Sequence, residues 1–233
     1  MTDQSTQPLT NPRAAGWRYS PVHLLIAIAL LLISSPFIQE LSFAQIVEAI
    51  LFTLVVLSGL FAVPSRGALL PGFLLAGVTL LAQWSSFFFP QIGPVSLIAA
   101  MVFITLVIVR LMLYVLSARE VNHETLCASV AGFLMIGLLW TLTYTLVAQL
   151  DPKAFAISTE GQTMDGFEAF YFSFVTLTTI GFGDITPVSR VARMLSVMEA
   201  ITGMFYVAVL VARLVSIYST PLSKDSSVAG PDK

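Results

Sequence analysis

The sequence has few charged residues, one cysteine and two histidines. Asp, Glu, Lys and Arg make up 10% of the 233 residues, whereas hydrophobic residues make up 57%. Soluble domains carry roughly 25% charged residues, so this composition excludes a soluble globular domain and indicates a polytopic membrane protein. A formal net charge of −2 gives no reason to expect nucleic acid as a partner. With Cys127 as its only cysteine, the chain has no intramolecular disulfide and no cysteine-based metal cluster.

The charges that occur within apolar runs are isolated. Arg110 is the one internal charge of the run at 94–117. Moving one charge across the membrane corresponds to about 2.3 kcal/mol per 100 mV, so a single arginine predicts only shallow voltage dependence. We interpret Arg110 as an anchor that reaches water near the end of its helix. Glu48 is a functional candidate as an intramembrane carboxyl, or else a protonated or hydrogen-bonded group near the outer end. His123 has no ligand partner nearby and is expected in a solvated loop.

Six apolar runs approach or exceed the roughly 20 residues that a membrane-spanning helix needs. They cover residues 22–38, 41–63, 69–89, 94–117, 126–150 and 188–218. The first run could also be a signal peptide, but its length, its Pro36 and the lack of an Ala-x-Ala site favour a retained span. The runs predict a tail at 1–20, a four-helix transmembrane domain at 21–118, a second membrane domain at 125–218 and a tail at 219–233.

A shorter apolar segment lies between the last two runs. Residues 151–165 are polar and are expected to form an external turret. Residues 166–178 are predicted to form a helix, with Asp165 as its N-cap and Glu168 in its first turn. Such a helix is too short to cross a bilayer. A short apolar helix followed by non-helical backbone indicates a re-entrant pore helix.

The stretch at 176–184 reads Thr-Leu-Thr-Thr-Ile-Gly-Phe-Gly-Asp. Its two glycines alternate with bulky residues, which permits alternating left-handed backbone angles. These angles can turn successive carbonyls to one side, and four such rows around an axis would replace the water shell of a cation. A glycine-rich turn is the alternative. An intramembrane aspartyl protease would need a second aspartate within a span. The other aspartates, all outside the apolar runs, are Asp3, Asp151, Asp165, Asp225 and Asp232.

The stretch resembles the selectivity filter of potassium channels, whose usual form is Thr-Val-Gly-Tyr-Gly-Asp where this chain has Thr-Ile-Gly-Phe-Gly-Asp. The chain is similar to prokaryotic-type six-segment channels without a recognisable voltage sensor, and the match covers the pore domain at 125–218. The resemblance implies an all-α membrane protein with six transmembrane helices, a re-entrant pore helix and an extended filter at 179–183. It further implies a homotetramer in membrane lipid, conduction of K⁺, no enzymatic activity and no cofactor. The residues implied to bind K⁺ are Thr179, Ile180, Gly181 and Phe182, through their carbonyls and the Thr179 hydroxyl.

The surroundings of the filter depart from the usual pattern. The residues expected to support the filter are Thr178, Gly183, Asp184 and Tyr171. Phe182 replaces the commoner tyrosine, Tyr171-Phe172 replaces a tryptophan pair, and Val175 stands where some bacterial relatives have a glutamate. The filter therefore has fewer polar contacts behind it. We predict that the Tyr171 hydroxyl bonds Asp184 and provides part of that support.

Two residues of the last run are further candidates. Gly203 is either a gating hinge, as the resemblance implies, or a close-packing position against a neighbouring helix. Glu199, one turn earlier, is a possible buried acid that either bonds behind the filter or faces the central cavity. The residues leave both choices open.

The distribution of basic residues predicts the orientation. With both termini cytoplasmic in the cell membrane, the inner segments hold eight Lys and Arg and the outer segments three, which satisfies the positive-inside rule. No nucleotide-binding or calcium-binding domain is expected in the short tail at 219–233, so the gating stimulus is unassigned. The alternatives to a K⁺-selective channel are a weakly selective cation channel and a non-conducting membrane sensor.

Overall fold

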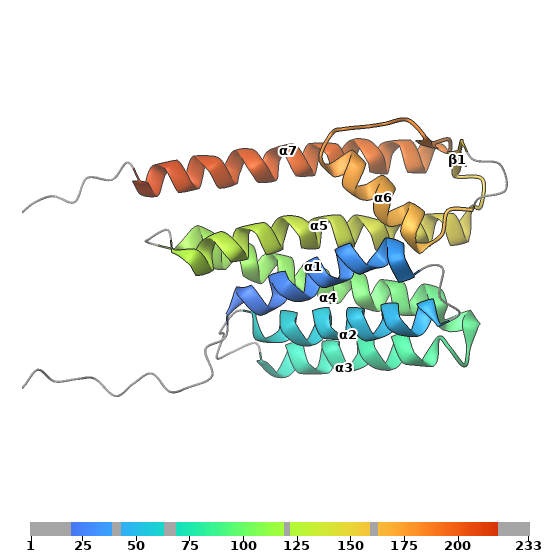
Figure 1. Cartoon of the computed structure of the whole chain (residues 1–233), viewed down its shortest axis with the longest axis horizontal. Helices are drawn as coiled ribbons and strands as arrows, with labels where there is room; N and C mark the ends of the chain where they lie inside the picture. Colours follow the sequence, from blue (N-terminus) through green and yellow to red (C-terminus); the bar gives the residue numbers. More distant parts are fainter. Residues whose placement is uncertain (1–19, 39–42, 63–68, 119–121, 159–162, 219–233) are drawn as a thin grey trace, which may run out of the picture.

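Each long apolar run of the sequence forms a helix, and the helices lie side by side along one direction (Figure 1). The computed structural model of the chain describes residues 20–38, 43–62, 69–118, 122–158 and 163–218. The predicted tail at 219–233, and all of the predicted tail at 1–20 except Ser20, lie outside the described residues. The first described helix begins, and the last one ends, at the same end of the bundle (Figure 1).

The first half of the chain forms four helices in alternating directions. They are α1 (Pro21–Ile38), α2 (Ala44–Phe61), α3 (Leu69–Ser85) and α4 (Gly93–Ser117), with a 3₁₀ turn, η1 (Pro90–Ile92), directly before α4. The second half contains α5 (His123–Leu150), β1 (Phe155–Ile157), α6 (Gly166–Leu177), β2 (Ile185–Pro187) and α7 (Arg190–Tyr218). The predominance of helix confirms the predicted all-α class.

Among the described residues, five helical segments are long and apolar enough to cross a membrane: α1, α2, η1 with α4, α5 and α7. Helix α3 has 17 residues and so extends about 25 Å, which is less than the roughly 30 Å of a bilayer core. It ends at Ser85, four residues before the predicted end, where turns lead into Pro90. The chain is thus a multi-pass membrane protein, and a sixth span stays a prediction.

Local hydrogen bonds explain two of the helix starts that differ from those predicted. The Asn122 side chain accepts a hydrogen bond from Thr125 N at 2.8 Å and starts α5 at His123, which therefore is not a loop residue. At the other helix, the amides of Val188 and Ser189 donate to the Ala154 carbonyl instead of joining α7. Helix α7 therefore begins at Arg190, two residues later than predicted.

One continuous core joins the two halves of the chain. It includes Leu24 and Ile28 of α1, Val56 of α2, Phe103 of α4 and Met135 of α5, all nearly or fully buried. Helix α5 packs against α1, α4, α6 and α7, so it connects the upstream helices to α6 and α7. Within one chain, therefore, the upstream bundle packs through α1 and α4 against helix α5 of the chain's own carboxy-terminal module.

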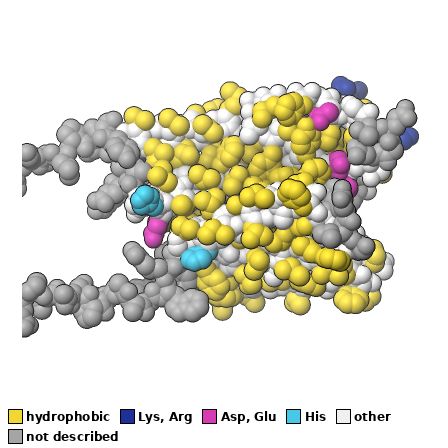
Figure 2. Space-filling model, viewed as in Figure 1, with side chains coloured by type: hydrophobic (Ala, Val, Ile, Leu, Met, Phe, Trp, Pro, Cys, Tyr) yellow, Lys and Arg dark blue, Asp and Glu magenta, His cyan; other side chains and the backbone are white. Residues whose placement is uncertain are grey.

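The surface between the two ends of the bundle is apolar. Figure 2 shows hydrophobic side chains over this face, with charged side chains and the histidines gathered near the ends. Such a band is what a lipid environment requires, because apolar side chains there face hydrocarbon. Arg110 lies in the second half of α4, with its guanidinium near Gly72 of α3.

Candidate functional site

Helix α6 is positioned by its two ends. Asp165 Oδ1 accepts hydrogen bonds from the backbone amides of Phe167 and Glu168 at 2.9 and 3.2 Å, so the predicted N-cap is present. The helix ends at Leu177, which is buried, and Thr178 follows as the C-cap. Twelve residues give about 18 Å, so α6 enters the apolar depth of the bundle without crossing it.

The backbone after α6 has left-handed angles at every second residue. The φ angles of Thr179, Gly181 and Gly183 are +59°, +59° and +80°. Glycine adopts this conformation readily, whereas a β-branched threonine does so at a cost of about 1–3 kcal/mol. Thr179 is held there because its amide donates to the Thr176 carbonyl at 2.9 Å and the Ile180 amide donates to the Val175 carbonyl at 2.9 Å. Strained backbone of this kind concentrates at functional sites.

The same segment is uncovered in the single chain. Every residue from 178 to 184 is exposed, and the apolar side chains of Ile180 and Phe182 are 57% and 68% exposed. A Cβ added to Gly181 or Gly183 would meet no atom within 4 Å. An exposed, strained and partly apolar loop is costly unless something outside the chain contacts it.

Asp184 is bonded to α6 as predicted. The Tyr171 hydroxyl donates to Asp184 Oδ2 at 2.7 Å, and the Ile185 amide donates to Oδ1 at 3.0 Å. The Tyr171 bond holds the pKa of Asp184 below its usual value. The rings of Tyr171 and Phe182 are stacked, with centroids 6.4 Å apart and planes within 5°. One tyrosine therefore contacts both the loop and the carboxylate that follows it.

A two-stranded antiparallel sheet holds the exit of this loop, and the sequence did not predict it. Strand β1 comes from the polar turret and β2 follows Asp184, with Ala156 opposite Thr186. The amide and the hydroxyl of Ser158 both donate to the Asp184 carbonyl at 2.9 Å. Strands of three residues separated by 27 positions carry no periodic signal, so only the closing of α5, α6 and α7 around them reveals the pairing.

Glu199 lies behind the loop, with a relative exposure of 0% between α5, α6 and α7. Its Oε2 accepts a hydrogen bond from the Tyr144 hydroxyl at 2.5 Å, and its Oε1 lies 2.6 Å from Ser173 Oγ. Ser173 Oγ also lies 2.8 Å from the Gly137 carbonyl. Of the two placements open from the sequence, the geometry therefore selects the one behind the loop.

Ser173 Oγ lies within hydrogen-bond distance of two acceptors but has one hydroxyl proton. That proton can go to Glu199 Oε1 or to the Gly137 carbonyl, which also accepts from the Thr141 hydroxyl. A protonated Glu199 carboxyl that donates to Ser173 Oγ would let both contacts hold a hydrogen, and we expect this arrangement. A neutral carboxyl also suits a fully buried position, because the described residues place no cation against it.

Gly203 is in close contact with α6. A Cβ at this position would overlap the Leu177 carbonyl oxygen and lie 3.0 Å from the Leu177 side chain. Close packing therefore accounts for a glycine here, and α7 continues through it as one helix. A hinge at Gly203 stays a prediction.

The remaining candidates lie elsewhere. Glu48 of α2 lines a cavity at the end of the bundle where α6 begins. His123 is exposed at the start of α5, and Cys127 is half-buried as a free cysteine. The described residues contain no cluster of three or more His, Cys, Asp or Glu side chains that could hold a metal ion.

Comparison with known proteins bears on the same segment. Residues 132–220 match the family model described as "Ion channel". The two-pore potassium channel 4 of Arabidopsis thaliana is 30% identical over 101 residues, which are 43% of this chain and 36% of that protein. The matched residues include the short helix, the strained loop and α7. This part of the chain is therefore similar to an ion-channel module.

Two further relatives of the channel module are similar over shorter regions. The two pore potassium channel c of Oryza sativa subsp. japonica is 41% identical over 59 residues, which are 25% of this chain and 13% of the relative. The two-pore potassium channel 3 of Arabidopsis thaliana is 40% identical over 71 residues, which are 30% of this chain and 16% of that relative. The matches therefore span about a third or less of the curated relatives' length.

Proposed function

We propose that the protein is a K⁺-selective channel in which four copies place their loops at 179–183 around one axis. The left-handed angles at Thr179, Gly181 and Gly183 carry this proposal, because they allow a row of backbone carbonyls to face one side. Carbonyls of Thr179, Ile180, Gly181 and Phe182, with the Thr179 hydroxyl, would replace the hydration shell of K⁺. The names of the plant relatives, which are potassium channels, support the same ion.

The uncovered surfaces of the single chain support assembly. Helix α7 has only 17% of its apolar span buried, against 56% for α5. Large side chains along α7, among them Met194, Met204 and Phe205, are more than 60% exposed. The exposed filter lies next to this helix in the chain. One row of carbonyls cannot surround an ion, and the printed sequence contains one such stretch, so four copies complete the site.

The end of α6 adds an electrostatic contribution. The carbonyl end of a helix carries a partial negative charge, and α6 ends at Leu177 directly before the filter. Four such ends around an axis would favour a cation between them. Tyr171 and Ser158 would hold the outer end of the filter through Asp184, and Glu199, Tyr144 and Ser173 would hold α6 from behind.

Orientation and gating belong to the same proposal. The excess of basic residues on the side of both termini favours cytoplasmic termini in a cell membrane and a filter mouth facing outward. Helix α4 has Arg110 as its one basic residue, so conduction is expected to depend weakly on voltage. A weakly selective cation channel and a non-conducting sensor are the competing outcomes of the test below.

The test is ion flux in liposomes that contain the purified protein. We expect K⁺ and Rb⁺ to pass and Na⁺ and Li⁺ to be excluded. Gly181→Ala is the informative variant, because its Cβ has open space in the chain but its φ of +59° is left-handed. That conformation costs about 1–2 kcal/mol in each copy for a residue with a Cβ, so selective flux should be lost.

Gly77→Ala is the matched control. This helical glycine of α3 also has no atom within 4 Å of an added Cβ, and it lacks a left-handed φ. Its flux should equal that of the wild type. Na⁺ flux equal to K⁺ flux in the wild type would instead identify a weakly selective channel. Absence of flux for every ion would identify a non-conducting sensor, provided that a thermal unfolding transition shows the protein to be folded.

A further inference from the structure

A cavity of about 570 Å³ lies between the upstream helices and the helices α5 and α6, and no filter residue lines it. It is bounded by α1 to α5 at the end of the bundle where α6 begins, and Gly166 and Phe170 of α6 form part of its wall. Its volume falls within the roughly 300–1,000 Å³ of small-molecule sites. The cavity is therefore large enough for an organic ligand.

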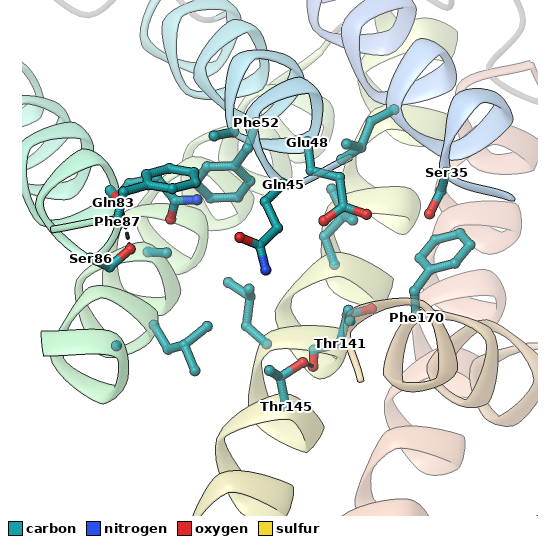
Figure 3. Close-up of a pocket in the computed structure, with 18 of the residues that line it drawn as sticks. Ser35, Gln45, Glu48, Phe52, Gln83, Ser86, Phe87, Thr141, Thr145 and Phe170 are labelled. Atoms are coloured by element: carbon teal, nitrogen blue, oxygen red, sulfur yellow. Dashed lines mark hydrogen bonds between the residues drawn. The ribbon is translucent and has the colours of Figure 1, made fainter. Parts of the chain in front are cut away.

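The cavity contains polar groups of both kinds, amides that donate and accept and oxygens that accept. Figure 3 shows Gln45 and Glu48 of α2 pointing toward Thr141 and Thr145 of α5. The two threonine hydroxyls donate their protons to carbonyls of their own helix at 2.9 Å, to Gly137 and Thr141. Their remaining lone pairs can only accept. An occupant that donates hydrogen bonds therefore finds acceptors at the two threonines and at Glu48.

The charge of the lining has one sign. Glu48 contributes a carboxyl group, and no described lysine or arginine lines the cavity. None of the described residues donates a hydrogen bond to Glu48. The Asp165 carboxyl at the start of α6 is close enough for its charge to interact with that of Glu48. A half-buried carboxyl without a partner is costly, and a cation in the cavity would reduce that cost.

The rest of the wall is aromatic and aliphatic. Phe52, Phe87 and Phe170 line the cavity, and Figure 3 shows them around the polar groups. Aromatic rings bind apolar groups and attract cations over their faces. The Phe170 ring packs on the Phe174 ring with centroids 4.6 Å apart, and so connects the cavity to the C-terminal half of α6.

We propose that this cavity binds the ammonium group of an amphipathic amine, with Glu48 as its counter-ion and the three phenylalanines around its apolar part. The threonine acceptors, the carboxyl of Glu48 and the aromatic wall together fit that chemistry. The occupant would contact α6 at Gly166 and Phe170, away from the filter residues 179–183.

The test is calorimetric binding of phenethylamine to the purified full chain in lipid nanodiscs, which does not depend on conduction. 2-Phenylethanol has the same size and ring but lacks the charge. We expect the amine to bind and the alcohol to bind at least about tenfold more weakly. Glu48→Gln should weaken amine binding about tenfold, because the charge-assisted bond is lost, and Glu48→Asp should retain most of it.

Asp151→Asn is the matched control, since it removes one exposed carboxylate at the end of α5 outside the cavity. It should leave the affinity unchanged, and thermal unfolding of each variant establishes that it is folded. Equal affinity for amine and alcohol, or unchanged amine affinity in Glu48→Gln, would overturn the proposal. Either result leaves the flux test of the channel unaffected, so the two proposals fail separately.

The ammonium group could come from a soluble amine or from a lipid headgroup, and nanodisc composition separates these sources. A headgroup in the site would compete with phenethylamine, so phosphatidylethanolamine would weaken the measured affinity relative to phosphatidylglycerol. That difference should shrink in Glu48→Gln if the competition occurs at this carboxyl. The same lipid effect in both proteins, with Glu48-dependent amine binding, assigns the site to a soluble amine.

Discussion

Glu199 allows the sharpest test of the packing behind the filter. Its carboxyl joins α7 to Tyr144 of α5 and Ser173 of α6 by contacts of 2.5 and 2.6 Å, and Ser173 reaches the Gly137 carbonyl at 2.8 Å. We expect a neutral carboxyl that donates to Ser173, because both contacts of Ser173 then hold a hydrogen. Glutamine has nearly the same shape and can also donate to Ser173 Oγ while accepting from Tyr144.

The two substitutions at this position should therefore differ in cost. Glu199→Gln keeps all three contacts and adds one buried N–H, so we expect it to lower the free energy of unfolding by about 1 kcal/mol. Glu199→Ala leaves the Tyr144 and Ser173 hydroxyls without this partner, at about 1–3 kcal/mol each, and opens a cavity. We expect Glu199→Ala to lower the free energy of unfolding by about 3–5 kcal/mol. We also expect K⁺ flux to decline faster with time, because α6 loses its contact with Glu199 of α7.

The assay combines denaturant unfolding in micelles with infrared spectroscopy. A protonated carboxyl gives a carbonyl band that a carboxylate lacks, and this band should be present in the wild type and absent in Glu199→Gln. Glu124→Gln, in the first turn of α5, is the control and should leave the band in place. A wild-type spectrum without the band, or equal destabilisation by glutamine and alanine, would refute the reasoning.

Two other predictions concern the filter module. Gly203→Ala should lower the free energy of unfolding by about 1–3 kcal/mol because its Cβ overlaps the Leu177 carbonyl, whereas Gly77→Ala should be neutral or raise it by up to about 1 kcal/mol through helix propensity. Equal denaturation midpoints for the two would contradict close packing at Gly203. Tyr171→Phe should shorten the time for which the channel conducts. It should also raise the pKa of Asp184 toward its usual 3.8, because the Tyr171 hydrogen bond is the main cause that lowers this pKa. In the wild type the Tyr171–Asp184 bond is retained down to pH 3.8 and is lost only as the pH falls through the lowered pKa of Asp184 in the folded protein. A carboxyl NMR titration of Asp184 with the same midpoint in both proteins would contradict this prediction.

The features that the sequence determined by itself are local ones. Apolar runs of about 20 residues need lipid or a partner helix wherever they lie, so the helices could be located without a structure. Asp165 caps α6 through its own neighbours at 167 and 168, and the glycines at 181 and 183 admit left-handed angles whatever surrounds them. The contact of Tyr171 with Asp184 was also predictable, because a short helix followed by a returning loop brings the two together.

The tertiary structure decided what depends on groups far apart in the chain. Left-handed Thr179 departs from its residue preference, and its position follows from bonds made around the end of α6. The β1–β2 pair and the cavity at Glu48 each require several elements to meet. Glu199 could have faced the cavity or the packing behind the filter, because both faces of α7 are apolar in sequence. Only the positions of Tyr144 and Ser173, 55 and 26 residues away, select the second.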